Sequence, residues 1–284
     1  MISGCSNDDN NKEIKTLDKG PNSLEDTYEG IRSVLESAGK IERISLDIDF
    51  SGEEEEIGQE KEEPITEDGA TSGEETQNLQ AQSQSEETAD QAREDQLSDD
   101  EEESSSETNL GENLKETYKD MDKSLETIYI AWSDYESDGI KKGASKDRVI
   151  EFKDSLNKLA KSVEERNIVN IYESASLSLL NLKPFFDLYK DDYRGEICQL
   201  EHSIYQYYIK AVTGDKEGAL IAADGNEESI NRLRLLLADD EKKEEILDKV
   251  STQLENLGIS LDDDSQRVHI LEKDTLIRNI ESLK

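Results

Sequence analysis

Apolar side chains recur at alternating steps of three and four residues in the second half of this chain, and this periodicity constrains the fold more than any other feature. The clearest run comprises Leu114, Tyr118, Met121, Leu125, Ile128, Trp132 and Tyr135. Such spacing places the side chains on one face of an α-helix, and that face must be buried against other helices. The pattern therefore predicts an all-α fold for the C-terminal half.

The same periodicity continues in later segments that end at glycines or polar turns. Further helices are predicted over 145–163, 168–189, 196–213, 219–223, 229–238, 242–257 and 265–283. Pro184 falls within one of these segments and is expected to kink or divide its helix. Helices joined by short turns pack as antiparallel neighbours, so residues 110–284 are expected to form an antiparallel helical bundle or stacked helical hairpins.

The segment 51–109 has the opposite composition. It contains 22 acidic residues, and its only basic residues are Lys61 and Arg93. Apolar residues are too few there to offset the conformational entropy of folding, and the like charges repel one another. We predict a disordered acidic linker over 51–109, which leaves the N-terminal half largely disordered. Weak calcium binding by its carboxylates is an alternative role.

A smaller periodic element precedes this linker. Its apolar residues at helical spacing are Leu24, Tyr28, Ile31, Leu35 and Ala38. The run from Ile44 to Phe50 then alternates apolar and polar residues, as a half-buried strand does. We expect 1–21 to be a flexible tether and 22–50 to form a small helical element, with a strand as its second part. The pattern leaves open whether this element docks on the bundle.

The residues around Cys5 carry one resemblance to a known class of protein. Ile2, Ser3 and Gly4 precede Cys5, and polar residues follow it. This arrangement resembles the lipobox of bacterial lipoproteins, although the basic and apolar segments that precede such a box are not in the sequence. The resemblance implies lipidation of Cys5 and a place on the extracytoplasmic face of the cell membrane. The alternative is a cytoplasmic protein in which Cys5 has no special role.

The net charge of −37 restricts the partners of the chain. So large a negative charge repels nucleic-acid phosphates and anionic lipid head groups. A protein partner or a cationic ligand is therefore expected, and nucleic acid is not. No run of apolar residues is long enough to cross a bilayer, so contact with a membrane is expected only through an acyl anchor at Cys5.

Familiar catalytic and metal-binding motifs are absent from the sequence. It has two histidines, His202 and His269, which lie far apart, and it lacks zinc-binding, phosphate-binding and nucleophile-elbow patterns. Cys198 lies within a helical pattern and is expected to be a small buried side chain. We therefore predict no catalytic residues, no metal site and no cofactor, and His202 is expected at the surface or at its boundary.

Tyrosines are concentrated near the end of the segment 196–213. Tyr205, Tyr207 and Tyr208 cannot all point the same way on a helix, so at least one is expected to be exposed. Together with Lys210 they form a candidate partner surface, because tyrosine adds contact area at small entropic cost. The alternative is a broad buried stripe with its hydroxyl groups at the rim.

These features favour a non-enzymatic, lipid-anchored extracytoplasmic protein whose helical domain acts as a binding or scaffolding module. One alternative is a cytoplasmic adaptor that binds basic partners through its acidic surface. Another is an enzyme or metal-dependent protein whose site the sequence does not reveal.

Overall fold

A computed structural model of the chain describes residues 18–46, 99–262 and 265–284, and for 99–109 it gives the backbone alone. Cys5 and most of the predicted linker lie outside the described residues. The helices are α1 (Asn22–Ser45), α2 (Asp99–Lys142), α3 (Lys146–Glu164), α4 (Ile168–Phe186), α5 (Arg194–Val212), α6 (Lys216–Asp224), α7 (Glu227–Leu237), α8 (Glu241–Asn256) and α9 (Gln266–Glu281), with a 3-10 helix η1 (Leu257–Asp262) before α9. The described ranges contain no strand, so the all-α prediction is confirmed.

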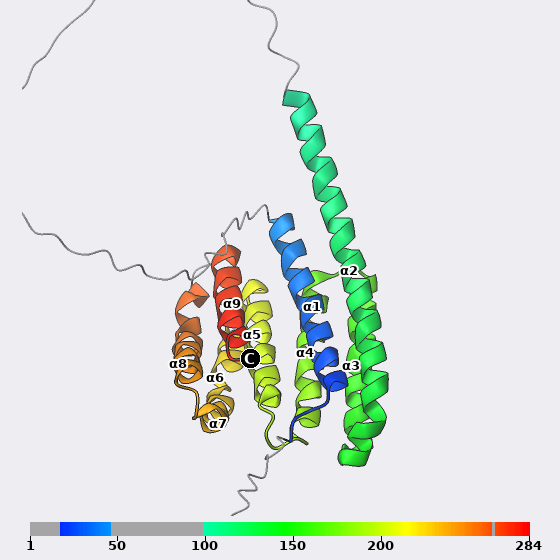
Figure 1. The fold of residues 1–284 in the computed structure, drawn as a ribbon. Coiled ribbons are helices and arrows are strands. Elements are labelled where there is room, and N and C mark those ends of the chain that lie inside the picture. The colour runs from blue at the N-terminus through cyan, green and yellow to red at the C-terminus, as the bar shows by residue number, and fades with distance from the viewer. Residues whose placement is uncertain (1–17, 47–98, 263–264) are drawn as a thin grey trace, which may run out of the picture.

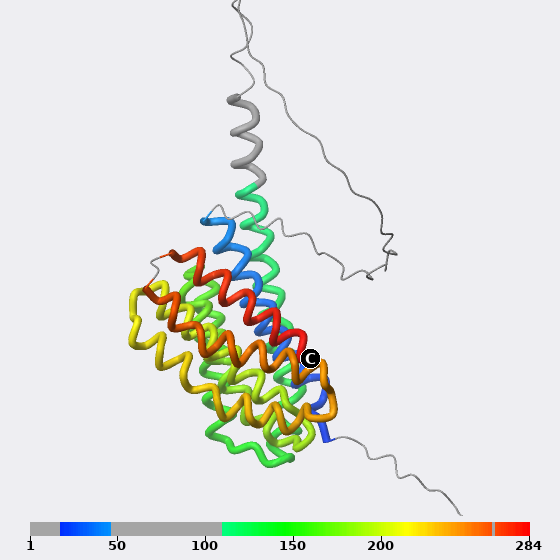
Figure 2. Tube along the Cα trace, turned by 90° about the vertical axis from the view of Figure 1, so that its left-hand side faces the viewer, coloured from blue at the N-terminus to red at the C-terminus, as the bar shows by residue number. Residues whose placement is uncertain are grey.

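The helices lie side by side in a row of antiparallel pairs. Helices α2 and α3 form one end of the row, α1 and α4 follow, then α5 and α9, and α6 to α8 form the other end (Figure 1). Figure 2 shows the molecule from the side of α8 and α9, with α2 farthest from the viewer. Short turns hold consecutive helices antiparallel, as the predicted bundle requires.

Helix α1 lies inside this row, so the described part of the predicted element, residues 22–46, docks on the bundle. Its predicted apolar face is buried, and Val34 and Ile41 beyond that face are buried as well. The helix packs against α2 on one side and α4 on another. Even the polar Arg32 and Glu42 are at most 8% exposed. The predicted small helical element, whose docking the sequence left open, is therefore part of the core.

The helix α1 also extends farther than predicted. It continues past Gly39 to Ser45, so Ile44 and Ser45 are helical, Leu46 forms the turn that follows, and the prediction of a strand is wrong for these three residues. Packing against α2 and α4 along its length favours the helix over the local alternation. The rest of the predicted strand, 47–50, lies outside the described residues.

Helix α2 begins earlier than the apolar pattern predicts. Its backbone is helical from Asp99, within the segment assigned to the linker. The predicted seam of α2 is buried at Met121, Ile128, Trp132 and Tyr135. The N-terminal part of α2 extends past the neighbouring helices (Figure 1), and Leu110 there is exposed.

An aromatic cluster joins α2 to α3 and α4. The ring centre of Trp132 lies 4.3 Å from that of Phe152 and 4.9 Å from that of Phe185. Pro184, next to Phe185, does not divide α4, because the helix runs without a break to Phe186 and ends there. The proline lies in the last turn, where only one hydrogen bond within the helix is lost.

Candidate functional site

The predicted tyrosine surface is buried in the structure. Tyr205 is 6% exposed, Tyr207 is fully buried and Tyr208 is 1% exposed, so the expectation that one of them is exposed is wrong. The reason is that α4, α6, α7 and α9 all pack around α5, which leaves no outward face for these rings. Lys210 points elsewhere, and its ammonium lies 3.3 Å from the carboxylate of Asp215. These four residues therefore do not form a surface for a partner.

Two of these tyrosines instead surround a buried lysine from α9. The ammonium of Lys273 lies 5.1 Å from the ring centre of Tyr172, 4.9 Å from that of Tyr208 and 5.9 Å from that of Tyr205. The hydroxyl groups of Tyr172 and Tyr208 both donate to the carboxylate of Glu42 on α1. We call Lys273 and the three rings around it the lysine cage. Together with Glu42, the lysine cage connects α1, α4, α5 and α9 through cation–π contacts and hydrogen bonds.

A second buried polar cluster is centred on Glu201 of α5. Its carboxylate accepts the Tyr28 hydroxyl at 2.9 Å and pairs with the Arg32 guanidinium at 3.0 Å. Burial raises the pKa of Glu201 even though Arg32 and Lys284 oppose the shift. The side chain is 1% exposed, so no substrate could reach it as an acid or base. Arg32 also pairs with Glu281, which links α1 to α9.

A third cluster fixes the start of α5 against α7. Glu196 accepts from the Lys183 ammonium at 2.8 Å, from the Ser229 hydroxyl at 2.7 Å and from Arg232 at 3.0 Å. Burial acts to raise the pKa of Glu196, but the hydrogen bonds from Lys183 and Ser229 outweigh it and lower the pKa. The buried carboxylates of Glu42, Glu196 and Glu201 all cross-link helices.

Cys198 and His202 are also buried or engaged within the fold. Cys198 is fully buried, as predicted, and burial raises the pKa of its thiol. His202 lies at the surface boundary, as predicted, where its Nδ1 is 3.0 Å from the Ser176 carbonyl oxygen and burial lowers its pKa. Within the described ranges, no three His, Cys, Asp or Glu side chains converge on a possible metal position. No helix there is both long and apolar enough to pass through a bilayer.

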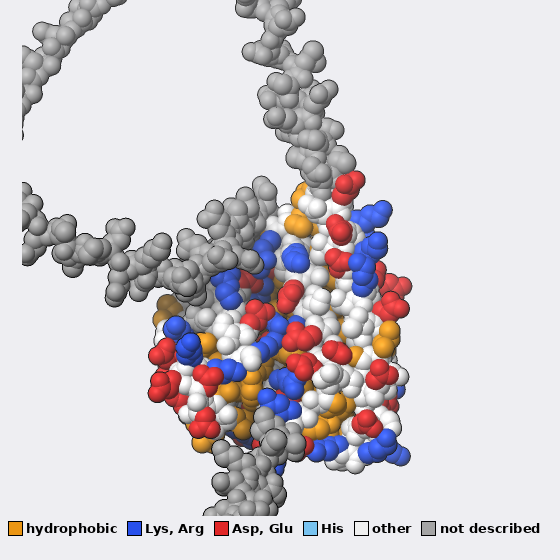
Figure 3. All heavy atoms as spheres, viewed as in Figure 1, with side chains coloured by type: hydrophobic (Ala, Val, Ile, Leu, Met, Phe, Trp, Pro, Cys, Tyr) orange, Lys and Arg blue, Asp and Glu red, His pale blue; other side chains and the backbone are white. Residues whose placement is uncertain are grey.

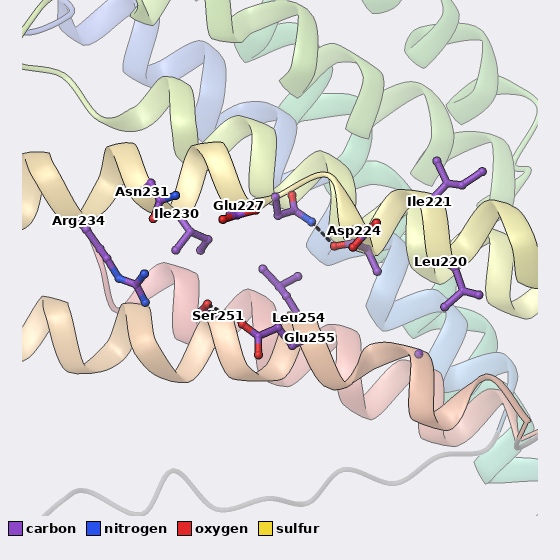
Figure 4. A pocket seen from close by; sticks show the side chains of 13 residues that line it. Leu220, Ile221, Asp224, Glu227, Ile230, Asn231, Arg234, Ser251, Leu254 and Glu255 are labelled. Atoms are coloured by element: carbon purple, nitrogen blue, oxygen red, sulfur yellow. Dashed lines mark hydrogen bonds between the residues drawn. The ribbon is translucent and has the colours of Figure 1, made fainter.

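An open groove lies between α6, α7 and α8 (Figure 4). It has a volume of about 600 Å³. The residues that line it are Leu220, Ile221, Ala223, Asp224, Asn226, Glu227, Ile230, Asn231, Arg234, Ser251, Leu254, Glu255 and Gly258. This volume lies within the range of known ligand pockets.

The groove has apolar walls that no other part of the described structure covers. Leu220 is 49% exposed and Ile221 is 69% exposed, although both are large apolar residues. Ile230 and Leu254 are buried and complete the apolar part of the lining. An uncovered groove with apolar walls is typical of a binding surface.

One polar group in the groove is buried without a partner. Asn226 is 3% exposed, and its amide nitrogen donates to the carbonyl oxygens of Ala222 and Ala223. Its Oδ1 oxygen is buried and has no hydrogen-bond partner among the described residues. A buried oxygen without a donor costs free energy, and a ligand that supplied a donor would offset that cost.

On the face shown in Figure 3, basic and acidic side chains are interspersed. Hydrophobic side chains are visible in the lower part of that view, and the exposed large apolar residues Leu220, Ile221, Leu235 and Leu236 belong to α6 and α7. The α6–α8 end of the row thus combines exposed apolar residues with charged ones. Between residues 216 and 258 the sequence has eleven acidic and six basic residues, so this end carries net negative charge.

Comparisons with known proteins identify no relative of this chain. No protein-family model matches it, and no curated protein or solved structure is significantly similar to it. The candidate site therefore rests on the geometry of the chain alone.

The amino-acid sequence alone does not reveal this groove. The signal was present in apolar residues that lie beside the helical seams, such as Ile221 next to Leu220 and the run from Leu235 to Leu237. Periodicity predicts which face of a helix is buried, but it does not show which apolar residues remain exposed after the helices have packed.

Proposed function

We propose that this protein is a non-enzymatic, lipid-anchored extracytoplasmic binding module. In this proposal an acyl group on Cys5 holds the chain at the membrane, residues 6–21 connect that anchor to α1 of the bundle, and the groove between α6, α7 and α8 receives a protein partner. The observation that carries it is the uncovered groove with the exposed side chains of Leu220 and Ile221 in its lining, because the buried carboxylates, Cys198 and the predicted tyrosines are all engaged within the fold. The lipobox-like residues before Cys5 support the anchor.

The anchor is tested by metabolic labelling. The native gene and a Cys5→Ala version are expressed in a bacterium that is supplied with a fatty-acid analogue. The wild-type chain is expected to carry the label and the variant to lose it. Equal labelling of the two would remove the anchor and leave the cytoplasmic adaptor as the better account.

Binding in the groove is tested by photo-crosslinking in cells. A benzophenone side chain replaces Ile221, which is 69% exposed in the groove, or Leu235, which is 81% exposed on the same group of helices but does not line the groove. We expect defined protein adducts from position 221 that are absent from position 235. The same adducts from both positions, or none from 221, would contradict a binding role for the groove.

A further inference from the structure

The chemistry of the groove identifies the kind of partner that fits it. We infer that the groove receives an amphipathic, positively charged helix of a partner protein, an inference that rests on the proposed binding function. The walls are helices on both sides: α6 and α7 run along one edge and α8 along the other (Figure 4). An open trough of this kind accommodates a third helix, which lays its apolar face against the apolar wall residues.

The apolar part of the groove is continuous enough to take such a face. Leu220 and Ile230 project from α6 and α7 toward Leu254 of α8 (Figure 4). Gly258 completes this end: a side chain there would lie 3.0 Å from Leu220, so glycine leaves room for the leucine. Burial of large apolar side chains at the centre of an interface supplies most of its binding free energy.

The acidic residues at the rim select a cationic partner. Asp224 and Glu227 form no ion pair with any described residue, and Glu255 contacts only the Ser251 hydroxyl, at 3.4 Å. The one basic residue of the groove, Arg234, is already paired with Asp248 at 2.8 Å. The uncompensated charge at the rim is therefore negative, and lysine or arginine beside the apolar stripe of a partner would complement it.

The buried oxygen of Asn226 points to the same chemistry. The two hydrogen bonds from its amide nitrogen fix the orientation of the side chain, so its Oδ1 can only accept. A hydroxyl, amide or ammonium group satisfies that oxygen, whereas the phosphate or carboxylate of an anionic ligand cannot.

The negative charge at the rim of the groove also disfavours negatively charged occupants. The acidic stretch 51–98 of this chain would bring further negative charge to a negative rim. Anionic lipid surfaces are repelled for the same reason. A basic helix from another protein is the occupant that satisfies the apolar walls, the rim and the Asn226 oxygen together.

The test uses the full-length chain without its acyl group and a fluorescent synthetic peptide of about 14 residues. The peptide carries leucines at helical spacing and lysines beside that stripe. One control peptide has the same composition in shuffled order, and another has glutamate in place of lysine. Fluorescence anisotropy measures binding. We expect the helical lysine peptide to bind about tenfold more tightly than either control.

Matched variants locate the binding. Ile221→Asp removes an apolar wall residue and Glu227→Lys reverses one rim charge; each is expected to weaken binding of the lysine peptide about tenfold. Leu235→Asp, outside the groove, is expected to leave it unchanged. Circular dichroism shows that each variant keeps its helices.

Three results would overturn the inference. Equal binding of the shuffled peptide would mean that charge alone attracts it. Unchanged binding by the Ile221→Asp variant would place the peptide elsewhere. Co-sedimentation with phosphatidylcholine vesicles that is lost in Ile221→Asp would assign the groove to a lipid surface. If the adducts from position 221 persist while the lysine peptide fails, the binding function stands and the partner chemistry is wrong.

Discussion

The ammonium group of Lys273 on α9 lies 4.9 Å from the centre of the Tyr208 ring on α5. With Tyr172 and Tyr205 close by, the lysine is enclosed by three aromatic rings at 3% side-chain exposure. Its ammonium also donates to the Asp274 carboxylate at 2.9 Å. A buried charge normally costs free energy, and here the rings and the carboxylate offset that cost.

Removal of the Lys273 side chain should therefore destabilise the fold. Lys273→Ala leaves a cavity between the three rings and is expected to lower the free energy of unfolding by about 2–4 kcal/mol. Lys273→Met fills most of the space without the charge and is expected to cost about half as much. Urea denaturation followed by circular dichroism measures both. An alanine variant as stable as the wild type would show that the cage contributes nothing to stability.

A second prediction concerns the pair of Arg32 and Glu201, which lie 3.0 Å apart in the core. Arg32→Met leaves the Glu201 carboxylate buried without its main partner and is expected to cost about 3–5 kcal/mol. Adding Glu201→Gln removes the stranded charge, so the double variant should be more stable than Arg32→Met alone. Urea denaturation of the two single variants and the double variant measures the coupling. Additive losses would show that the two groups do not stabilise each other.

The periodic pattern predicted most of the helices because helix formation depends largely on residues that are close together in the sequence. The buried stripe of α2 at Met121, Ile128 and Trp132 and the side-chain cap of α3 by Ser145 both follow from the residues nearby. The position of α1 could not be read in this way. Its buried Arg32 is satisfied by residues of α5 and α9 that lie far along the chain, and the amino-acid pattern around position 32 carries no information about those partners.

The tyrosines of α5 also show that local periodicity does not reveal which helices will pack around a given helix. A helix with one buried face exposes at least one of Tyr205, Tyr207 and Tyr208, and the prediction of a partner surface assumed such a helix. In the structure α5 is surrounded, so all three rings are buried. The groove could not be predicted because the exposure of its apolar residues depends on how α6, α7 and α8 pack together, which local periodicity does not show.

The third prediction concerns pH. Because hydrogen bonds lower the pKa of Glu196 below its ordinary value of 4.5, this group stabilises the fold above that value and ceases to do so as the pH falls through the lowered pKa. Glu196→Gln should therefore destabilise the protein at pH 7 more than at about pH 3. Urea denaturation at the two pH values measures the difference. Glu126→Gln, at an exposed position of α2, is the control and should change stability little at either pH. A pH-independent loss in Glu196→Gln would contradict this role.

The last prediction concerns the close approach of α1 to α2. A Cβ atom at Gly30 would lie 2.6 Å from the Cγ1 atom of Ile128, which is fully buried and cannot move aside freely. Gly30→Ala is therefore expected to cost about 1–3 kcal/mol, although alanine is the better helix former. Gly39→Ala is the matched control in the same helix. Its Cβ would meet only an ordinary contact at 3.5 Å, and the change should be neutral or stabilise by up to about 1 kcal/mol.

A double variant separates steric overlap at Gly30 from other effects. Ile128→Ala removes the side chain that the new methyl group meets, so it should cost about 2–5 kcal/mol by leaving a cavity. In that background Gly30→Ala should add no further loss, because the methyl group then occupies part of the space. Thermal and urea unfolding of the four proteins give the coupling. If Gly30→Ala cost the same with and without the isoleucine, the two helices would not be in contact there, and α1 would not occupy the interior position from which Arg32 and Glu42 reach α5 and α9.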